Sequence, residues 1–165
     1  MQTLIVRYRP KGILLDTNLL LLLFVGLADS SSIGDFRRIQ NHGFTEKEYL
    51  LLANIVGAFS KIVTTPHILT ETSNFILQHK GQARPAVMET FRKSVESFKE
   101  RRPESKTLVQ SGAFRDFGLT DSAILDLPPK RYLVLSVDLE LVVALKKKGV
   151  DAINFNHLRQ SNWLQ

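Results

Sequence analysis

The sequence has 165 residues, with 22 Lys and Arg against 16 Asp and Glu, a formal net charge of +6 at pH 7, and no cysteine. A chain of this length can bury about 70% of its unfolded surface without a disulfide or a structural metal, so one domain over residues 1–165 is expected. The lack of cysteine excludes disulfide frameworks, thiolate zinc sites and thiol nucleophiles. The positive charge favours contact with a polyanion such as nucleic acid.

The most apolar run covers residues 19–28, with Asp16 and Asn18 before it and Asp29 after it. A membrane span needs about 20 apolar residues, so this run predicts a buried helix. The first ten residues carry Arg7 and Arg9 after their apolar residues, whereas a secretory signal carries its positive charges first. We therefore expect a cytoplasmic protein without a membrane segment.

Short aliphatic runs alternate with helical patterns along the chain, which is typical of βα units and a mostly parallel sheet. A run without polar alternation begins at Tyr132 and predicts a strand covered on both faces. Residues 1–8 are expected to add a short strand at an edge. The clearest strands are expected at residues 13–15, 62–65, 132–137 and 152–155.

Several helix boundaries have clear signals. Thr45 and Glu48 have the spacing of a capping box, which predicts a helix from Glu46 to about residue 59. Thr65 and Pro66 supply an N-cap and a first-turn proline for the next helix. A helix over residues 139–148 is expected to end at Gly149. Between these helices, residues 82–115 have helical character and carry seven cations that predict the main basic patch: Arg84, Arg92, Lys93, Lys99, Arg101, Arg102 and Lys106.

Four acids occupy positions that an α/β fold brings together. Asp16 follows the strand at 13–15 directly, and Asp138 ends the strand at 132–137. The carboxyl ends of parallel strands form the usual ligand-binding edge of such sheets. Asp121 is expected to open a short helix over 122–127 at the same rim, and Glu71 lies at the border of the apolar stripe of the helix after Pro66. Ordinary roles remain open for each acid, namely capping for the three aspartates and solvent exposure for Glu71.

Carboxylates that share a pocket repel one another by about 4 kcal/mol for each close pair. Such a cluster needs a positive counter-charge. Oxygen ligands, without cysteine or a helical His-x-x-x-His pair, indicate Mg²⁺ or Mn²⁺ rather than zinc. A divalent ion there can orient and acidify a water and stabilise the charge that develops on a phosphodiester, which is hydrolytic phosphoryl-transfer chemistry.

The ordered set Asp16-Thr17-Asn18, Glu71, Thr120-Asp121 and Ser136-Val137-Asp138 resembles the acidic motifs of PIN-domain nucleases, over about residues 13–155. The resemblance implies a three-layer α/β/α sandwich that binds Mg²⁺ or Mn²⁺ and cleaves RNA as an endoribonuclease. Carried over by position, the four acids would be catalytic metal ligands. The resemblance also makes Asn18 and Ser136 supporting groups that hold carboxylates or metal-bound water through hydrogen bonds.

Many small PIN proteins are VapC-type toxins of toxin–antitoxin pairs, in which a protein partner occupies the active-site groove. If the resemblance extends to this subtype, it implies an antitoxin-like protein partner. The resemblance to PIN domains in general also implies a homodimer. The leading segment 1–10 and the region 82–115 are longer than compact toxins require. We interpret Trp163 as a packing or dimer anchor rather than a base-stacking platform.

Other readings fit the sequence to different degrees. A non-catalytic PIN-like module that binds RNA or protein is the main alternative. A haloacid-dehalogenase-type phosphotransferase would need a second acid two residues after Asp16, where Asn18 stands. A receiver domain would need adjacent acids after the first strand, and the sequence lacks the Gly-x-x-x-x-Gly-Lys-Ser/Thr pattern of a P-loop enzyme.

Overall fold

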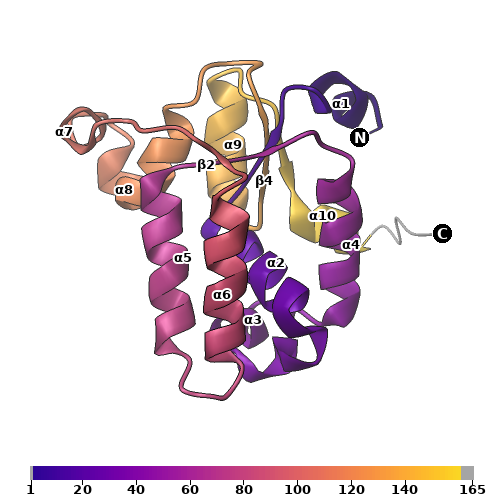
Figure 1. Ribbon diagram of the computed structural model, residues 1–165. Coiled ribbons are helices and arrows are strands. Elements are labelled where there is room, and N and C mark those ends of the chain that lie inside the picture. Colours follow the sequence, from indigo (N-terminus) through magenta and orange to yellow (C-terminus); the bar gives the residue numbers. More distant parts are fainter. Residues whose placement is uncertain (1, 161–165) are drawn as a thin grey trace.

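The structure is a computed structural model that describes residues 2–160, so Trp163 lies outside the described residues. The chain folds as a three-layer α/β/α sandwich around one parallel sheet, which confirms the predicted fold class (Figure 1). In the described residues the sheet has 5 strands in the order β3-β2-β1-β4-β5, and each pairing is parallel. The strands are β1 (Ile13–Leu15), β2 (Ile62–Thr64), β3 (Lys99–Glu100), β4 (Leu133–Ser136) and β5 (Ala152–Asn154).

The two strands that end at predicted acids lie inside the sheet. β1 is the middle strand, and β4 lies between β1 and β5. Every residue of both strands is buried, as expected of strands covered on both faces. Their register pairs Leu15 with Leu135, so the two strands reach the carboxyl edge of the sheet together.

The predicted strand over residues 1–8 is wrong, because residues 2–8 form a helix. α1 (Gln2–Tyr8) precedes β1, and the edge position beside β2 is taken by β3, where Lys99 pairs with Val63. Tyr8 ends the helix with a fully buried side chain, and its hydroxyl donates a hydrogen bond to Asp151. The periodicity of a short apolar run does not distinguish a strand from a helix. In this segment the packing of Tyr8 against the protein core favours the helix.

The remaining helices surround the sheet. α2 begins directly after Asp16, and its buried residues confirm the expected buried helix. The helical stretch Thr17–Asp35 is long and apolar enough to cross a membrane, but 61% of an apolar 18-residue part of it is buried inside the protein, as in a core helix. The elements are α2 (Thr17–Asp29), the 3₁₀ helix η1 (Ser30–Asp35), α3 (Arg37–Asn41), α4 (Glu46–Gly57), α5 (Pro66–Gln78), α6 (Arg84–Val95), α7 (Ser105–Leu108), α8 (Phe114–Leu125), α9 (Leu139–Lys147) and α10 (Phe155–Gln160).

The predicted starts of α4, α5 and α9 agree with the structure. Thr45 and Glu48 form the capping box of α4, and the Thr65 hydroxyl accepts a hydrogen bond from the backbone N–H of Ile68 at the start of α5. α9 is followed by Gly149, which has a φ of +76°. Glycine adopts this left-handed conformation without the strain that a side chain would add, which explains the stop signal after the lysines.

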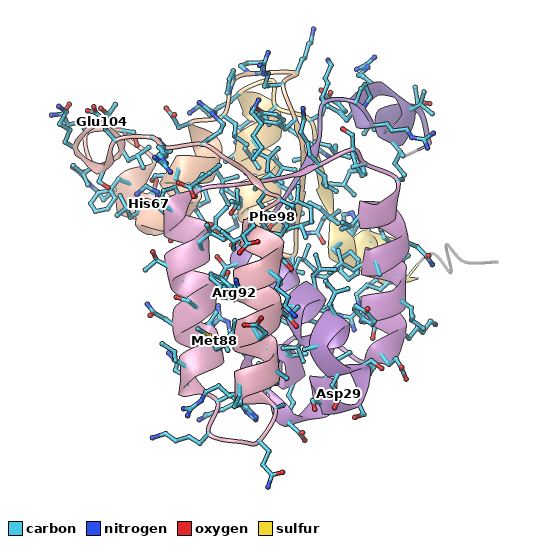
Figure 2. All side chains as sticks on the ribbon, in the orientation of Figure 1. Asp29, His67, Met88, Arg92, Phe98 and Glu104 are labelled. Atoms are coloured by element: carbon cyan, nitrogen blue, oxygen red, sulfur yellow. The ribbon has the colours of Figure 1, made fainter. Side chains whose placement is uncertain are left out.

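α6 packs on α2 and lies beside α5 (Figure 1). Its apolar side lies on Phe24, whose ring centroid is 5.2 Å from that of Phe91. Its outer side carries Arg92, which forms ion pairs with Glu89 at 2.8 Å and Glu96 at 2.9 Å (Figure 2).

Ion pairs engage four of the seven cations in the expected main basic patch over residues 82–115, whereas Arg84, Lys99 and Arg101 have none within residues 2–160. Lys93 pairs with Glu89, Arg102 with Glu100 and Lys106 with Glu104. The acidic partners lie three or four residues away on the same helix, or two residues away along a loop. A count of the cations alone does not include these opposite charges.

The contact between α2 and α4 depends on Gly26. A Cβ atom at this position would lie 2.1 Å from Cδ2 of Tyr49, so the tyrosine ring would have to move. We expect Gly26→Ala to lower the free energy of unfolding by about 1–2 kcal/mol in urea denaturation, because overpacking outweighs the gain in helix propensity. Gly57→Ala, in α4, is the control and is expected to be neutral or slightly stabilising, because a Cβ atom there would have nothing within 4 Å. Equal effects of the two substitutions would contradict this packing.

Candidate active site

Asp16 joins the middle strand to α2 and is only 4% exposed. Its Oδ1 accepts a hydrogen bond of 2.9 Å from the backbone N–H of Leu19, which makes it the N-cap of α2. Its Oδ2 accepts two more, from the Ser136 hydroxyl at 2.6 Å and from the backbone N–H of Val137 at 2.8 Å. Three donors thus compensate for much of the water that the carboxylate has lost.

Ser136 connects two of the predicted acids. Its side chain is fully buried at the end of β4, donates to Asp16, and accepts a hydrogen bond of 3.0 Å from the backbone N–H of Asp138. Asp138 is the N-cap of α9, because its Oδ1 accepts from the backbone N–H of Leu141 at 3.0 Å. The hydroxyl of Ser136 therefore fixes the relative positions of the two strand ends.

Glu71 approaches the same place from α5. Its Oε2 accepts a hydrogen bond of 2.9 Å from the Thr17 hydroxyl, and Thr17 is a buried residue in the first turn of α2. The acid is half-buried rather than fully solvated. Sequence reasoning quoted Thr17 within its motif but gave it no role, although a hydroxyl next to a strand-end acid is a signal for such a bond.

Asp121 lies inside α8 rather than before a short helix over 122–127, which corrects the predicted boundary. α8 is kinked at Gly118, which has φ 72° and ψ −174°, and helical structure resumes before Asp121. The glycine permits a left-handed conformation that the sequence signal did not reveal. Asp121 consequently lies in the turn that follows the kink and does not act as an N-cap.

These acids line one pocket of about 270 Å³, which we call the acidic pocket. Burial first, and then the neighbouring carboxylates of Asp16, Asp138 and Glu71, raise the pKa of Asp121 to about 7. Burial also raises the pKa of Asp16, although its hydrogen bonds oppose that effect. The acidic pocket is lined by Asp16, Thr17, Asn18, Arg38, Glu71, Phe117, Gly118, Leu119, Thr120, Asp121, Ser136, Asp138 and Leu141.

One cation, Arg38 of α3, lines the acidic pocket and was missed by sequence reasoning. Its Nε donates a hydrogen bond of 2.8 Å to Oδ1 of Asn18, and its guanidinium lies 4.5 Å from the centre of the Phe75 ring. Asn18 thus holds an arginine, where a carboxylate or a bound water was expected. No local pattern marks Arg38, because its distance from the acids is set by how α3 packs.

The pocket suits Mg²⁺ or Mn²⁺ in the chemistry of its donors. Within residues 2–160, no group of three His, Asp or Glu side chains is close enough together to hold a metal ion. Magnesium usually keeps several waters and binds through one or two carboxylates, so a hydrated ion does not require such a cage. In this part of the chain no hydrogen bond or ion pair engages either oxygen of Asp121, Oε1 of Glu71 or Oδ2 of Asp138, so these residues are the ones that could hold the ion.

The sequence matches no protein-family model and no curated protein, so the resemblance to PIN-domain nucleases rests on the motifs and stays a prediction.

The raised pKa of Asp121 predicts a pH-dependent cost to folding in metal-free protein. The unfolded carboxyl releases its proton near pH 4, whereas the folded one keeps it up to about pH 7, so stability falls as the pH rises through this window. We expect Asp121→Asn to be more stable than the wild type at pH 8 by about 1–3 kcal/mol in urea unfolding, and this gain to vanish near pH 4. Asp116→Asn, at an exposed position of α8, is the control. Parallel pH profiles for all three proteins would contradict the coupling of the acids.

Proposed function

We propose that this protein is a divalent-metal-dependent endoribonuclease of the PIN type that hydrolyses RNA phosphodiester bonds with Mg²⁺ or Mn²⁺. One observation carries the proposal: Asp16, Glu71, Asp121 and Asp138, far apart in the sequence, line a single pocket with too little positive charge of its own. The net charge of +6 agrees with a polyanionic substrate.

The four acids have different roles in this proposal. One or two of Asp121, Glu71 and Asp138 would bind a hydrated cation directly through their unengaged oxygens. Asp16 forms the floor of the pocket, where its three donors hold it in place. When bound, the cation acidifies a water and offsets the negative charge that develops on the phosphate. Thr17 fixes one oxygen of Glu71, a residue that lines the pocket, so less side-chain entropy is left to lose when the other oxygen binds the cation.

Arg38 is the residue that contacts the RNA phosphate in this proposal. Its hydrogen bond to Asn18 and its position over Phe75 hold the guanidinium at the rim of the pocket. An arginine binds phosphate oxygens through two parallel hydrogen bonds, which would orient the scissile bond over the acids.

The predictions about location, protein partner and oligomeric state are part of the same proposal. A cytoplasmic location is compatible with the largely buried α2. If the protein is a VapC-type toxin, a segment of its partner would occupy the groove that holds the acidic pocket. An antitoxin-like partner and a homodimer both follow from the resemblance.

The second candidate is a non-catalytic PIN-like module that binds RNA or protein. It is favoured by the fact that, among the described residues, no group of three potential ligands is arranged to hold a metal ion. In such a module the acids would serve as helix caps, as Asp16 and Asp138 do for α2 and α9.

A cleavage assay tests the catalytic proposal. Purified protein is incubated with a labelled structured RNA, with Mn²⁺, with Mg²⁺, and without metal. We expect cation-dependent cleavage that falls by at least roughly 100-fold in Asp16→Asn and in Asp121→Asn, because each loses charge stabilisation in the transition state. Glu140→Gln, an exposed acid in the first turn of α9, should cleave like the wild type. Undiminished cleavage by Asp121→Asn would reject the assignment.

Calorimetry with Mn²⁺ separates the two candidates without RNA. A catalytic site binds the ion in the free protein, and Asp121→Asn should bind it at least roughly tenfold more weakly. The Glu140→Gln protein should match the wild type. If neither the wild type nor the variants bind Mn²⁺, the non-catalytic module is the better explanation.

A further inference from the structure

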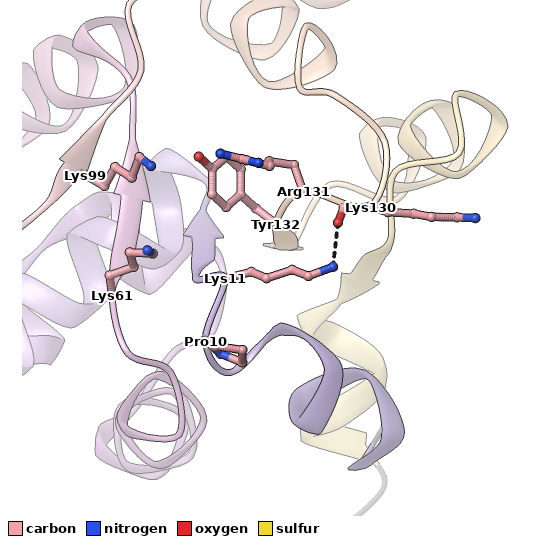
Figure 3. A pocket seen from close by; sticks show the side chains of 7 residues that line it. All are labelled: Pro10, Lys11, Lys61, Lys99, Lys130, Arg131 and Tyr132. Atoms are coloured by element: carbon pink, nitrogen blue, oxygen red, sulfur yellow. Dashed lines mark hydrogen bonds between the residues drawn. The ribbon is translucent and has the colours of Figure 1, made fainter.

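A second charged pocket lies at the opposite edge of the sheet from the acids. It is lined by residues that come just before, or at the start of, four neighbouring strands. Figure 3 shows Lys11 before β1, Lys61 before β2, Lys99 at the start of β3, and Arg131 before β4. We call this the basic pocket: Pro10, Lys11, Lys61, Lys99, Lys130, Arg131 and Tyr132.

The basic pocket contains no acid. It has a volume of about 270 Å³, and none of its lining residues is an Asp or Glu. Within residues 2–160, no ion pair neutralises Lys11, Lys61, Lys99 or Arg131, in contrast to the paired cations of α6. Like charges around one pocket repel one another, and an anion between them would offset that repulsion.

The backbone helps to gather these cations. Gly12 has a φ of +112°, and a Cβ atom there would lie 2.9 Å from Cγ of Lys61, so only glycine lets the two segments approach so closely. The Nζ of Lys11 donates a hydrogen bond of 3.1 Å to the carbonyl of Lys130. The side chain of Lys130 itself runs away from the other labelled side chains (Figure 3).

Tyr132 forms a buried wall of the pocket and is 4% exposed. Burial alone would raise the pKa of its hydroxyl, but Arg131 and Lys99 outweigh that effect and lower the pKa below its ordinary value. The guanidinium of Arg131 lies 5.9 Å from the centre of the tyrosine ring. The hydroxyl therefore lies in a strongly positive environment, where it can donate a further hydrogen bond to an anion.

We propose that the basic pocket binds the phosphate groups of a phosphorylated ligand, with Lys61, Lys99 and Arg131 as its charged contacts. Tetrahedral phosphate oxygens accept several charge-assisted hydrogen bonds at once, which matches cations that converge from neighbouring strands. The ligand is either a free nucleotide or the phosphorylated end of an RNA. This site is separate from the acidic pocket, because β1 alone places roughly 10 Å of strand between the two edges.

Titration calorimetry with inorganic diphosphate tests the proposal. The full-length protein is freed of metal on a chelating resin, so that no soluble chelator competes as an anion. We expect saturable binding at one site. Lys61→Gln combined with Lys99→Gln should weaken it by roughly tenfold for each lysine, because each substitution removes a charge-assisted hydrogen bond.

The matched control is Lys146→Gln combined with Lys147→Gln. It removes the same charge from two exposed positions in the last turn of α9, outside the basic pocket. Its affinity should stay close to that of the wild type, and thermal unfolding should show that both variants remain folded. An absence of saturable binding, or equal weakening in both double variants, would overturn the proposal.

Two competition arms identify the source of the phosphate. If a nucleoside diphosphate displaces inorganic diphosphate and a 5′-phosphorylated RNA does not, the ligand is a free nucleotide. If the 5′-phosphorylated RNA competes and the same RNA with a 5′-hydroxyl does not, the ligand is an RNA end. Both results support a phosphate site, and neither depends on cleavage activity.

Discussion

A carboxylate with almost no exposed surface stands at the end of the middle strand, and three hydrogen-bond donors keep it there. Asp16 accepts from the first turn of α2, from Ser136, and from the backbone that follows β4. Removing an unpaired charge from water costs several kcal/mol, so this position is tolerable only when both neighbouring segments are in register. The hydrogen bonds of Asp16 thus connect the strand pair β1 and β4 to the start of α2, which carries Thr17 and Asn18.

Parallel strands give the sheet two chemically different edges. At the carboxyl edge, α2 and α9 begin with Asp16 and Asp138 as N-caps, and the positive ends of the helix dipoles favour these acids. Asp121 accepts no capping hydrogen bond from the described residues, and its pKa rises to about 7 because it is buried and its neighbours repel it. At the amino edge the cations before the strands gather without counter-ions among the lining residues. Both proposed sites result from the alternation of strand and helix, because the residues that follow the strands gather at one edge of the sheet and those that precede the strands gather at the other.

The sequence predicted much of what depends on local pattern, including β1, β2, β4 and β5, the capped helices α4, α5 and α9, and the strand-end acids, but it missed the two-residue edge strand β3. It failed where packing decides. The helix ending at Tyr8 resembles a strand until its side chain is seen to be buried, and the kink at Gly118 moves the start of the helical turn before Asp121. Arg38 contacts Asn18 because of how α3 packs, which no spacing encodes, whereas the place of Thr17 beside a strand-end acid was a signal that the sequence did offer. A count of cations likewise does not show which of them are paired: Arg92 is paired twice on α6, whereas Lys99 of the same predicted patch lines the basic pocket.

Paramagnetic broadening by Mn²⁺ tests most directly whether the four acids form one cation site. Trace Mn²⁺ is added to ¹⁵N-labelled protein, and the loss of each amide signal is recorded. We expect signals near the acidic pocket to disappear first, such as those of Asn18, Asp121 and Val137, while those of Lys61 and Lys99 at the opposite edge persist. Broadening spread evenly over the surface, or centred away from the acidic pocket, would contradict a single cation site among these acids.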